Sequence, residues 1–336
     1  MGEPAVAGCE VSAGVLDGDT TADTLASGGV LGPGTGGSNA GAPAGAATEK
    51  TPSPIGEFWY FFRQNRGAVL GLALVIAFVF IALFAPWIAP YDPAFIHDGQ
   101  LTKLPFWSEG GTHQFWLGTD DVGRDLLSRL IFGARISMAV GFMVVVVSLS
   151  IGTLLGLLAG YAGGWVDALI MRMNDILMAL PSILLAIVVV TILGQNLTNA
   201  ILAVSVTVIP GFVRLVRAQV MVEKGRQYVI AARSFGAGPW RQVFSNILPN
   251  CMAPIIVQGT LGFSDGILSV AALGFLGLGA RPPTAEWGTM LSDARAFIET
   301  APWLVTLPGL CILIVVLAFN MLGDGLRDAL DPRMKK

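Results

Sequence analysis

Long, nearly charge-free apolar segments are the feature that most constrains this chain. Six of them follow one another along the sequence, at 68–85, 136–162, 176–194, 197–213, 251–280 and 301–322. A helix needs about 20 apolar residues to cross the hydrocarbon core of a membrane. The sequence therefore predicts an all-α integral membrane protein with six transmembrane helices.

Composition excludes several other classes of protein. Hydrophobic residues make up 54% of the chain and charged residues only 13%, whereas soluble domains carry about 25% charged residues. The net charge of −3 argues against a nucleic-acid partner. Three widely spaced cysteines and two histidines predict neither a disulfide framework nor a metal site.

The basic residues between the spans orient the chain in the membrane. Lys and Arg are enriched in the short cytoplasmic loops of membrane proteins. With a cytoplasmic N-terminus, fourteen basic residues lie on the cytoplasmic side and six on the other, so we expect both termini to be cytoplasmic. The six are Lys103, Arg124, Arg129, Arg135, Arg281 and Arg295.

The first 53 residues differ from everything that follows. They contain neither an aromatic residue nor an arginine, and they are rich in Gly, Ala, Ser and Thr. Such a segment buries too little apolar surface to offset the entropy lost on ordering. We expect residues 1–53 to be a disordered tail, and they lack the basic start and apolar core of a signal peptide.

The segment that follows contains five consecutive aromatic residues at 58–62 and then two arginines. Such a pattern is typical of a short helix at the membrane interface, although packing against neighbouring helices explains it almost as well. We expect residues 54–100 to hold this helix and the first transmembrane helix. Residues 101–134 are expected to form an extracytoplasmic loop, and residues 326–336 a cytoplasmic tail.

The longest cytoplasmic loop, residues 214–250, is expected to carry two short helices at 227–246. Gly236 and Gly238 end the first, since glycine adopts the backbone angles of a helix end. Pro239 suits the first turn of the second, which Leu248 and Pro249 are expected to end at the membrane. The small, weakly charged surface favours docking of another protein, with a helix lying on the membrane as the alternative.

This loop resembles the "EAA" loop of importer-type ATP-binding cassette (ABC) transporter permeases. Ala231, Ala232, Gly236 and the pair Leu248-Pro249 match the family pattern EAA-x3-G-x9-I-x-LP in spacing. Ile230 stands where the family has Glu, and Asn246 where it has Ile. The form Tyr-Val-x-Ala-Ala-Arg at 228–233 and the closing Leu-Pro-Asn are similar to the dipeptide/oligopeptide branch, which commonly lacks the Glu.

Three further blocks support the same branch, and the resemblance covers residues 54–336. They are LGTDDVGRDLLSR at 117–129 with the following GAR, GFLGLG at 274–279 with PPTAEWG at 282–288, and NMLGDGLRDALDP at 320–332. The resemblance implies the type I ABC importer permease fold, with residues 135–325 as the ABC transmembrane type-1 domain.

The resemblance also implies function and partners. The chain would be a multi-pass permease subunit in the bacterial inner membrane that carries dipeptides or short peptides. It would pair with a second permease subunit as a heterodimer, with two cytoplasmic ATPase subunits and an extracytoplasmic peptide-binding protein. The ATPases would use ATP and Mg²⁺. This chain has no GxxxxGK[ST] phosphate loop, so we expect it to bind no cofactor and to have no catalytic residue.

The resemblance assigns ATPase coupling to seven residues of the loop: Tyr228, Ala231, Ala232, Arg233, Gly236, Leu248 and Pro249. Tyr228 and Arg233 are the ones that we expect to contact the ATPase. Permeases for nickel or for longer oligopeptides share these blocks and remain alternatives. A stand-alone channel or secondary transporter is disfavoured, because such proteins need no coupling helix.

Asp265 is the one acidic residue well inside an apolar span. A charge there is costly and usually faces a cavity or a partner. One hypothesis is that it lines the translocation pathway, where it would attract the ammonium group of a peptide. The alternatives are that it pairs or hydrogen-bonds within the dimer, or that it is protonated.

The charged residues around position 120 are expected to stabilise local structure. Around residue 120 we expect Thr119 or Asp120 to cap an external helix, with Arg124 pairing with Asp121 and Arg129 with Asp125, rather than a cation site.

Further along the chain, Arg172 and Asp175 are spaced for an ion pair. The glycines of 273–279 suit either a seam with the partner permease or internal packing.

Overall fold

The computed structural model describes residues 54–330. The secondary structure of these residues is helical, apart from an isolated β-bridge between Thr119 and Asp125. The predicted tail 1–53 and the last residues, 331–336, lie outside the described residues. Five helices are long and apolar enough to cross a membrane, and a bent pair supplies a sixth crossing if it is counted as one span. The expected all-helical membrane architecture is confirmed. The five are α2 (Arg66–Leu83), α4 (Leu126–Ala162), α7 (Leu197–Lys224), α10 (Leu248–Phe275) with the helix that precedes it, and α12 (Trp303–Leu330).

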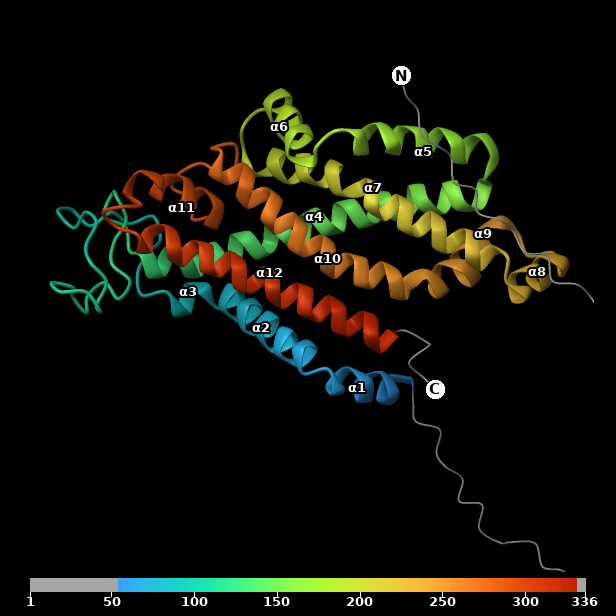
Figure 1. The fold of residues 1–336 in the computed structure, drawn as a ribbon, viewed down its shortest axis with the longest axis horizontal. Coiled ribbons are helices and arrows are strands. Elements are labelled where there is room, and N and C mark those ends of the chain that lie inside the picture. The colour runs from blue at the N-terminus through green and yellow to red at the C-terminus, as the bar shows by residue number, and fades with distance from the viewer. Residues whose placement is uncertain (1–53, 331–336) are drawn as a thin grey trace, which may run out of the picture. The chain divides into compact units, whose positions relative to one another are not determined.

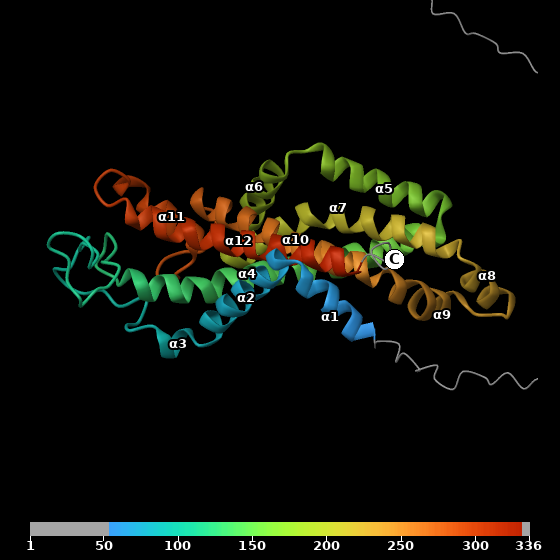
Figure 2. The ribbon, with the colours of Figure 1, turned by 60° about the horizontal axis from the view of Figure 1, so that its bottom comes forward.

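The long helices run side by side, and the chain reverses direction at two ends of the bundle (Figures 1 and 2). One end carries α1 (Pro54–Gln64), α8 (Gln227–Ser234) and the last turns of α12. The other end carries the segment 91–125 and α11 (Trp287–Ala294). Both ends of the described chain therefore lie at the same end of the bundle, as an even number of crossings requires.

Glycines on one face of α4 let α7 approach closely. Gly152, Gly156 and Gly160 are buried and spaced four residues apart, so they share a face of the helix. A Cβ atom at Gly156 would lie 2.7 Å from Cβ of Val216 on α7, too close for two carbon atoms. Small residues at such positions are the usual means of tight helix packing in lipid, where apolar burial gives little driving force.

The first helices are joined by a polar cap. Asn65 ends α1 and caps α2, because its Oδ1 accepts a 3.1 Å hydrogen bond from the backbone N–H of Ala68. Its Nδ2 donates to Asp328 of α12 at 3.0 Å. Phe62 of α1 is buried, while Trp59 and Tyr60 are exposed. One side of α1 therefore packs on the bundle, and the other remains free to face a membrane interface. After α2, the short helix α3 (Ala85–Ile88) turns the chain toward the segment 91–125.

The third predicted span is not a single helix. The chain forms α5 (Gly164–Ala179) and α6 (Ser182–Leu193), bent by 96° at Leu180 and Pro181. A residue before proline is driven out of the α conformation, and Leu180 is extended. Hydropathy does not report this break, because the residues on both sides of it are apolar.

The expected pair of Arg172 with Asp175 is wrong. Asp175 of α5 instead forms a 3.1 Å ion pair with Arg214 of α7. A second pair, between Arg217 and Asp167, holds the same two helices together closer to the α8 end. Spacing along one helix identified a possible partner, but the neighbouring helix supplies the actual one.

Internal packing accounts for Gly274 and Gly279, whereas Gly277 is exposed and no atom lies within 4 Å of its Cβ position. After α10 the chain returns as α11, and Trp287 at its start is fully buried. The Trp287 indole N–H donates to the carbonyl of Leu130 on α4 at 3.1 Å. A Cβ atom at Gly274 would lie 2.8 Å from Oε2 of the buried Glu286, which caps α11. A short 3₁₀ turn, η2 (Arg295–Phe297), follows α11.

Several helices extend beyond the apolar segments that predicted them. α4 begins at Leu126 rather than 136, α7 continues to Lys224 rather than 213, and α12 continues to Leu330 rather than 322. Hydropathy detects only the part of a helix that is apolar, whereas backbone hydrogen bonding continues into charged turns.

Candidate functional site

The predicted loop helices exist, and the glycine between them forms the expected helix end. α8 ends at Ser234, and Gly236 follows with φ of +82°, in the left-handed region. The N–H of Gly236 donates to the carbonyl of Arg233, and that of Ala237 to the carbonyl of Ala232, each at 3.0 Å. These two bonds form a Schellman motif, which satisfies the last carbonyls of the helix.

The second loop helix does not end at Leu248 and Pro249 as expected. α9 (Pro239–Arg241) passes through a π-helical segment, η1 (Gln242–Ile247), directly into α10. The N–H of Leu248 donates to the carbonyl of Val243, five residues back. Pro249 sits in the first turn of α10, where its missing N–H does not stop a helix. The loop is thus rigidly continuous with a spanning helix.

Tyr228 ties α8 to two spanning helices. Its hydroxyl donates to Glu223 Oε2 of α7 at 2.6 Å and accepts from Asn250 Nδ2 of α10 at 3.1 Å. Burial, followed by the bond to Glu223, raises the pKa of Tyr228 to about 12. The hydroxyl therefore stays protonated, and its hydrogen atom is directed at this chain's own Glu223.

The turn between α8 and α9 is fixed to α4 by a second set of contacts. Gln242 is buried and its Nε2 donates to the carbonyl of Ala237 at 2.6 Å. The Tyr161 hydroxyl, at the end of α4, donates to Gln242 Oε1 at 3.2 Å. Lys224 Nζ donates to the carbonyl of Tyr161 at 2.5 Å. Motif spacing did not identify these residues. Polar side chains at the ends of apolar spans would have indicated that hydrogen bonds join the loop to the helices there.

Exposed apolar side chains and an exposed arginine lie on the outside of the loop. Phe235 is 91% exposed and Trp240 is 77% exposed, and Ile230 is also exposed. Arg233 is exposed and makes no ion pair within residues 54–330. Exposed aromatic groups beside an arginine are typical of protein docking surfaces.

The other residues of the motif have different environments. Ala231 and Gly236 are exposed and Ala232 is half-buried, so a partner has close access to the backbone there. Leu248 is half-buried and Pro249 is exposed, and both lie in the first turn of α10 rather than on the outer tip of the loop. Five of the seven predicted residues lie on α8 or in the turn that ends it.

Asp265 lies on the outward side of α10. Its side chain is exposed and forms no hydrogen bond or ion pair with another residue of the described chain, whereas its neighbours Ser264 and Gly266 are buried. Leu261 and Gln258, which precede it by one and two turns on the same face, line a hollow of about 580 Å³. This hollow also contacts Gln219 of α7 and Arg327 of α12.

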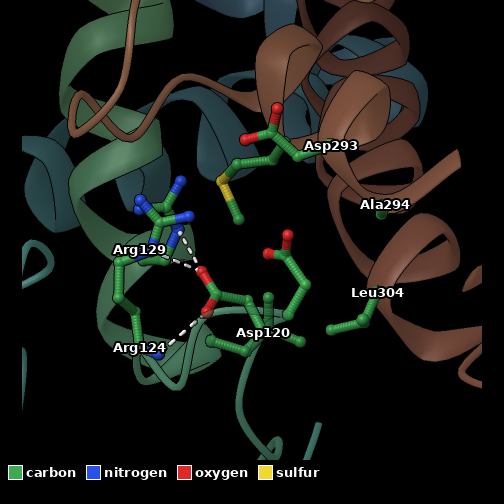
Figure 3. A pocket seen from close by; sticks show the side chains of 9 residues that line it. Asp120, Arg124, Arg129, Asp293, Ala294 and Leu304 are labelled. Carbon is green, nitrogen blue, oxygen red and sulfur yellow. Dashed lines mark hydrogen bonds and ion pairs between the residues drawn. The ribbon is translucent and has the colours of Figure 1, made fainter. Parts of the chain in front are cut away.

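The charged side chains of residues 120–129, at the opposite end of the bundle, form ion pairs and a helix cap with one another (Figure 3). Asp120 Oδ2 accepts from Arg124 Nε at 2.6 Å and lies 3.4 Å from Arg129 Nε, so the predicted partners Asp121 and Asp125 are wrong. Asp125, not Thr119 or Asp120, caps α4, because its Oδ2 accepts from the N–H of Ser128 at 2.8 Å. The hollow that these side chains enclose is about 20 Å³, which is room for one water molecule.

Two families of known proteins match this chain. Residues 152–336 match the family described as binding-protein-dependent transport system inner membrane component. Residues 53–105 match the N-terminal TM domain of oligopeptide transport permease C.

Individual relatives are similar over nearly their whole length. The di/tripeptide transport system permease protein DppC of Pseudomonas aeruginosa is 56% identical over 294 residues, which cover 88% of this chain and 97% of that protein. The dipeptide transport system permease protein DppC of Escherichia coli K12 is 59% identical over 284 residues, which cover 84% and 95%.

A solved structure shares the fold. It is a chain of the MetNI methionine ABC transporter in an inward-facing conformation, with a TM-score of 0.51 and 20% sequence identity. The match covers 60% of this chain and 97% of that one.

Proposed function

The chain belongs to the family of binding-protein-dependent transport system inner membrane components, and we propose that it is the permease subunit of an ABC importer that carries dipeptides. The observation that carries this proposal is its near-full-length similarity to permeases named for dipeptide transport. That similarity covers 88% and 84% of this chain, so it is not confined to the α8–α9 loop. Nickel or longer oligopeptides as the cargo are not favoured by these relatives.

The proposed assembly contains several other subunits. A second permease subunit completes a heterodimer, two cytoplasmic ATPase subunits supply energy, and an extracytoplasmic peptide-binding protein delivers the cargo. ATP and Mg²⁺ act in the ATPase subunits, and this chain contributes no catalytic residue. The family description, which names a binding-protein-dependent system, supports a binding protein among the partners.

The coupling step is proposed to run through the α8–α9 loop. Phe235 and Arg233 contact an ATPase subunit, and small residues such as Ala231 and Gly236 let its surface approach the backbone. When ATP closes the ATPase pair, the loop moves with it. The bonds of Tyr228 and Gln242 pass this movement to α7, α10 and α4, and the continuous helix from Pro239 through α10 transmits it along the bundle.

The proposed pathway lies along the outward face of α10. An exposed carboxylate inside an apolar span is stable only beside water or a partner group. Asp265 meets this condition if its face lines an aqueous path between the two permease subunits, where it attracts the ammonium group of a dipeptide. The hollow beside Gln258 and Leu261 continues the same face toward the coupling loop. Alternating access then opens this path to one side at a time.

The proposed location is the bacterial inner membrane, with the α8–α9 end and both termini in the cytoplasm. The distribution of basic residues supports this orientation. It places the coupling loop where cytoplasmic ATPases reach it.

Uptake measurements test the proposed cargo. A strain lacking this gene, with and without a plasmid-borne copy, is supplied with a labelled dipeptide, a labelled longer oligopeptide or nickel. We expect dipeptide uptake to be lost in the deletion strain and restored by the plasmid, with nickel uptake unchanged. Loss of nickel or oligopeptide uptake alone would assign that cargo instead. Unchanged uptake of all three would overturn the proposal.

A further inference from the structure

Two open hollows adjoin at the end of the bundle that carries α8 and α9. The first, of about 350 Å³, is lined by apolar side chains that include Leu154, Leu158 and Phe244. The second, of about 490 Å³, is lined by Lys224, Arg233 and Gln242 among others. Both volumes fall in the range of about 300–1,000 Å³ that small-molecule sites occupy. Tyr161, Ala162 and Pro239 line both hollows, so the two share a wall.

The first hollow suits a hydrocarbon chain. Leu154 and Leu158 are exposed on the spanning helix α4. Trp240 closes one side, and its ring stacks on Phe244 with centroids 5.1 Å apart. Tryptophan is enriched at the level of lipid headgroups, where its ring contacts acyl chains while its N–H meets water. The hollow thus lies between a helix long and apolar enough to span a membrane and a stacked aromatic pair.

The second hollow suits an anion. Lys224 Nζ is held at the shared wall by its bond to the Tyr161 carbonyl, and it lies 5.2 Å from the centroid of the Tyr161 ring. Arg233 lines the same hollow without an ion pair in the described chain. The residues lining the two hollows include no aspartate or glutamate. Two cations therefore face a space that has no acidic group to neutralise them.

We propose that an anionic phospholipid of the adjoining leaflet binds here, with an acyl chain in the first hollow and its phosphate beside Lys224. Basic pockets beside spanning helices bind anionic headgroups in this way. Charge complementarity and the apolar neighbour argue for a lipid rather than a free anion. The bound lipid braces α9 against α4, so it stiffens the coupling loop. The proposal does not depend on the identity of the cargo.

Photo-crosslinking tests the site. The full chain is reconstituted in phosphatidylcholine nanodiscs that contain a trace of a lipid with a photoreactive group near the acyl end. The probe is either phosphatidylglycerol or phosphatidylcholine with the same chains. We expect the phosphatidylglycerol probe to label the peptides that contain Leu154, Leu158 and Phe244 about fivefold more than the phosphatidylcholine probe.

Variants separate the two parts of the site. Leu158→Trp fills the first hollow and is expected to abolish the labelling. Leu184→Trp on α6 is the matched control, since Leu184 is 57% exposed and Leu158 is 56% exposed. Lys224→Met is expected to remove the preference for phosphatidylglycerol. If Leu158→Trp does not elute as a monodisperse protein, Leu154→Trp replaces it at the same hollow.

Four results would overturn the proposal. Equal labelling by both probes would exclude recognition of the headgroup. Labelling that survives the tryptophan variant would place the acyl chain elsewhere. Complete competition by glycerol phosphate without acyl chains would assign the cations to a free anion. Loss of labelling when the purified ATPase subunits are added, before any nucleotide, would show that a protein occupies the hollows.

Discussion

The hydroxyl group of Tyr228 on α8 lies 2.6 Å from Glu223 Oε2 on α7 and donates a hydrogen bond to it. The same oxygen accepts a bond from Asn250 at the start of α10. One side chain thus joins the surface loop to two spanning helices. A force applied to α8 therefore reaches the transmembrane bundle through directed bonds and not only through the connecting backbone.

Replacing Tyr228 with phenylalanine is expected to weaken this connection. The change removes the hydroxyl and leaves the ring, and a hydrogen bond to a charged group contributes about 1.5–3 kcal/mol. We expect dipeptide uptake to fall while the ATPase subunits still co-purify. Uptake and ATPase activity of the reconstituted complex measure the effect. Tyr60→Phe, on the exposed side of α1, is the control. Wild-type uptake by the Tyr228 variant would remove its hydroxyl from the coupling step.

Reversing the charge at Arg233 is expected to uncouple transport. Arg233 is exposed beside Phe235 and has no ion pair in the described chain, so a partner is free to bind it. For Arg233→Glu we expect more than a tenfold loss of uptake, the scale of a docking hot spot, with normal membrane insertion. Arg295→Glu, exposed near α11 at the opposite end, should leave uptake unchanged. Normal transport by the Arg233 variant would exclude it from the docking surface.

Adding a methyl group at Gly156 is expected to destabilise the bundle. Its Cβ would lie 2.7 Å from Val216 Cβ and 2.9 Å from the backbone oxygen of Val213. Overpacking of this kind costs about 1–3 kcal/mol. Gly211→Ala on α7 is the control, since its nearest neighbour beyond α7, Gln258, is at 3.9 Å. We expect Tm in detergent to fall for Gly156→Ala and to stay or rise for Gly211→Ala. Equal Tm values for the two variants would show that the contact at Gly156 relaxes without cost.

Neutralising Asp265 separates its two proposed roles. Asp265→Asn keeps the size of the side chain and removes its charge. If the carboxylate attracts the cargo, uptake falls while the second permease subunit co-purifies normally. If it bonds to the partner subunit, co-purification falls as well. Asp98→Asn is the control, because Asp98 is an exposed aspartate in the segment 91–125, outside the spanning helices. Unchanged uptake and unchanged assembly would contradict both roles.

Local rules predicted local structure well. The apolar segments located five spanning helices, and the glycines at 236 and 238 with Pro239 located the turn between the loop helices. Each of these depends on residues close in the sequence: hydropathy over about 20 positions, or the backbone angles of single residues. The end expected at Leu248 and Pro249 failed because the π-helical turn η1 lets the helix continue.

Spacing along the sequence predicted the wrong partners for several ion pairs. Asp175 pairs with Arg214 rather than Arg172, and Asp120 binds both Arg124 and Arg129. Rules for residues three or four apart assume an isolated helix. In the folded chain, a side chain from a neighbouring helix or turn competes for the same carboxylate.

Residue patterns along the chain were enough to predict a helical membrane protein, the approximate positions of its apolar spans and the loop that resembles a docking element. Those properties follow from the transfer of apolar segments out of water and from the backbone preferences of glycine and proline. The folded structure was needed to show that the loop is bonded to α4 and α10 and that two hollows meet at Tyr161. These features depend on atoms tens of residues apart, whose distances are set by helix packing.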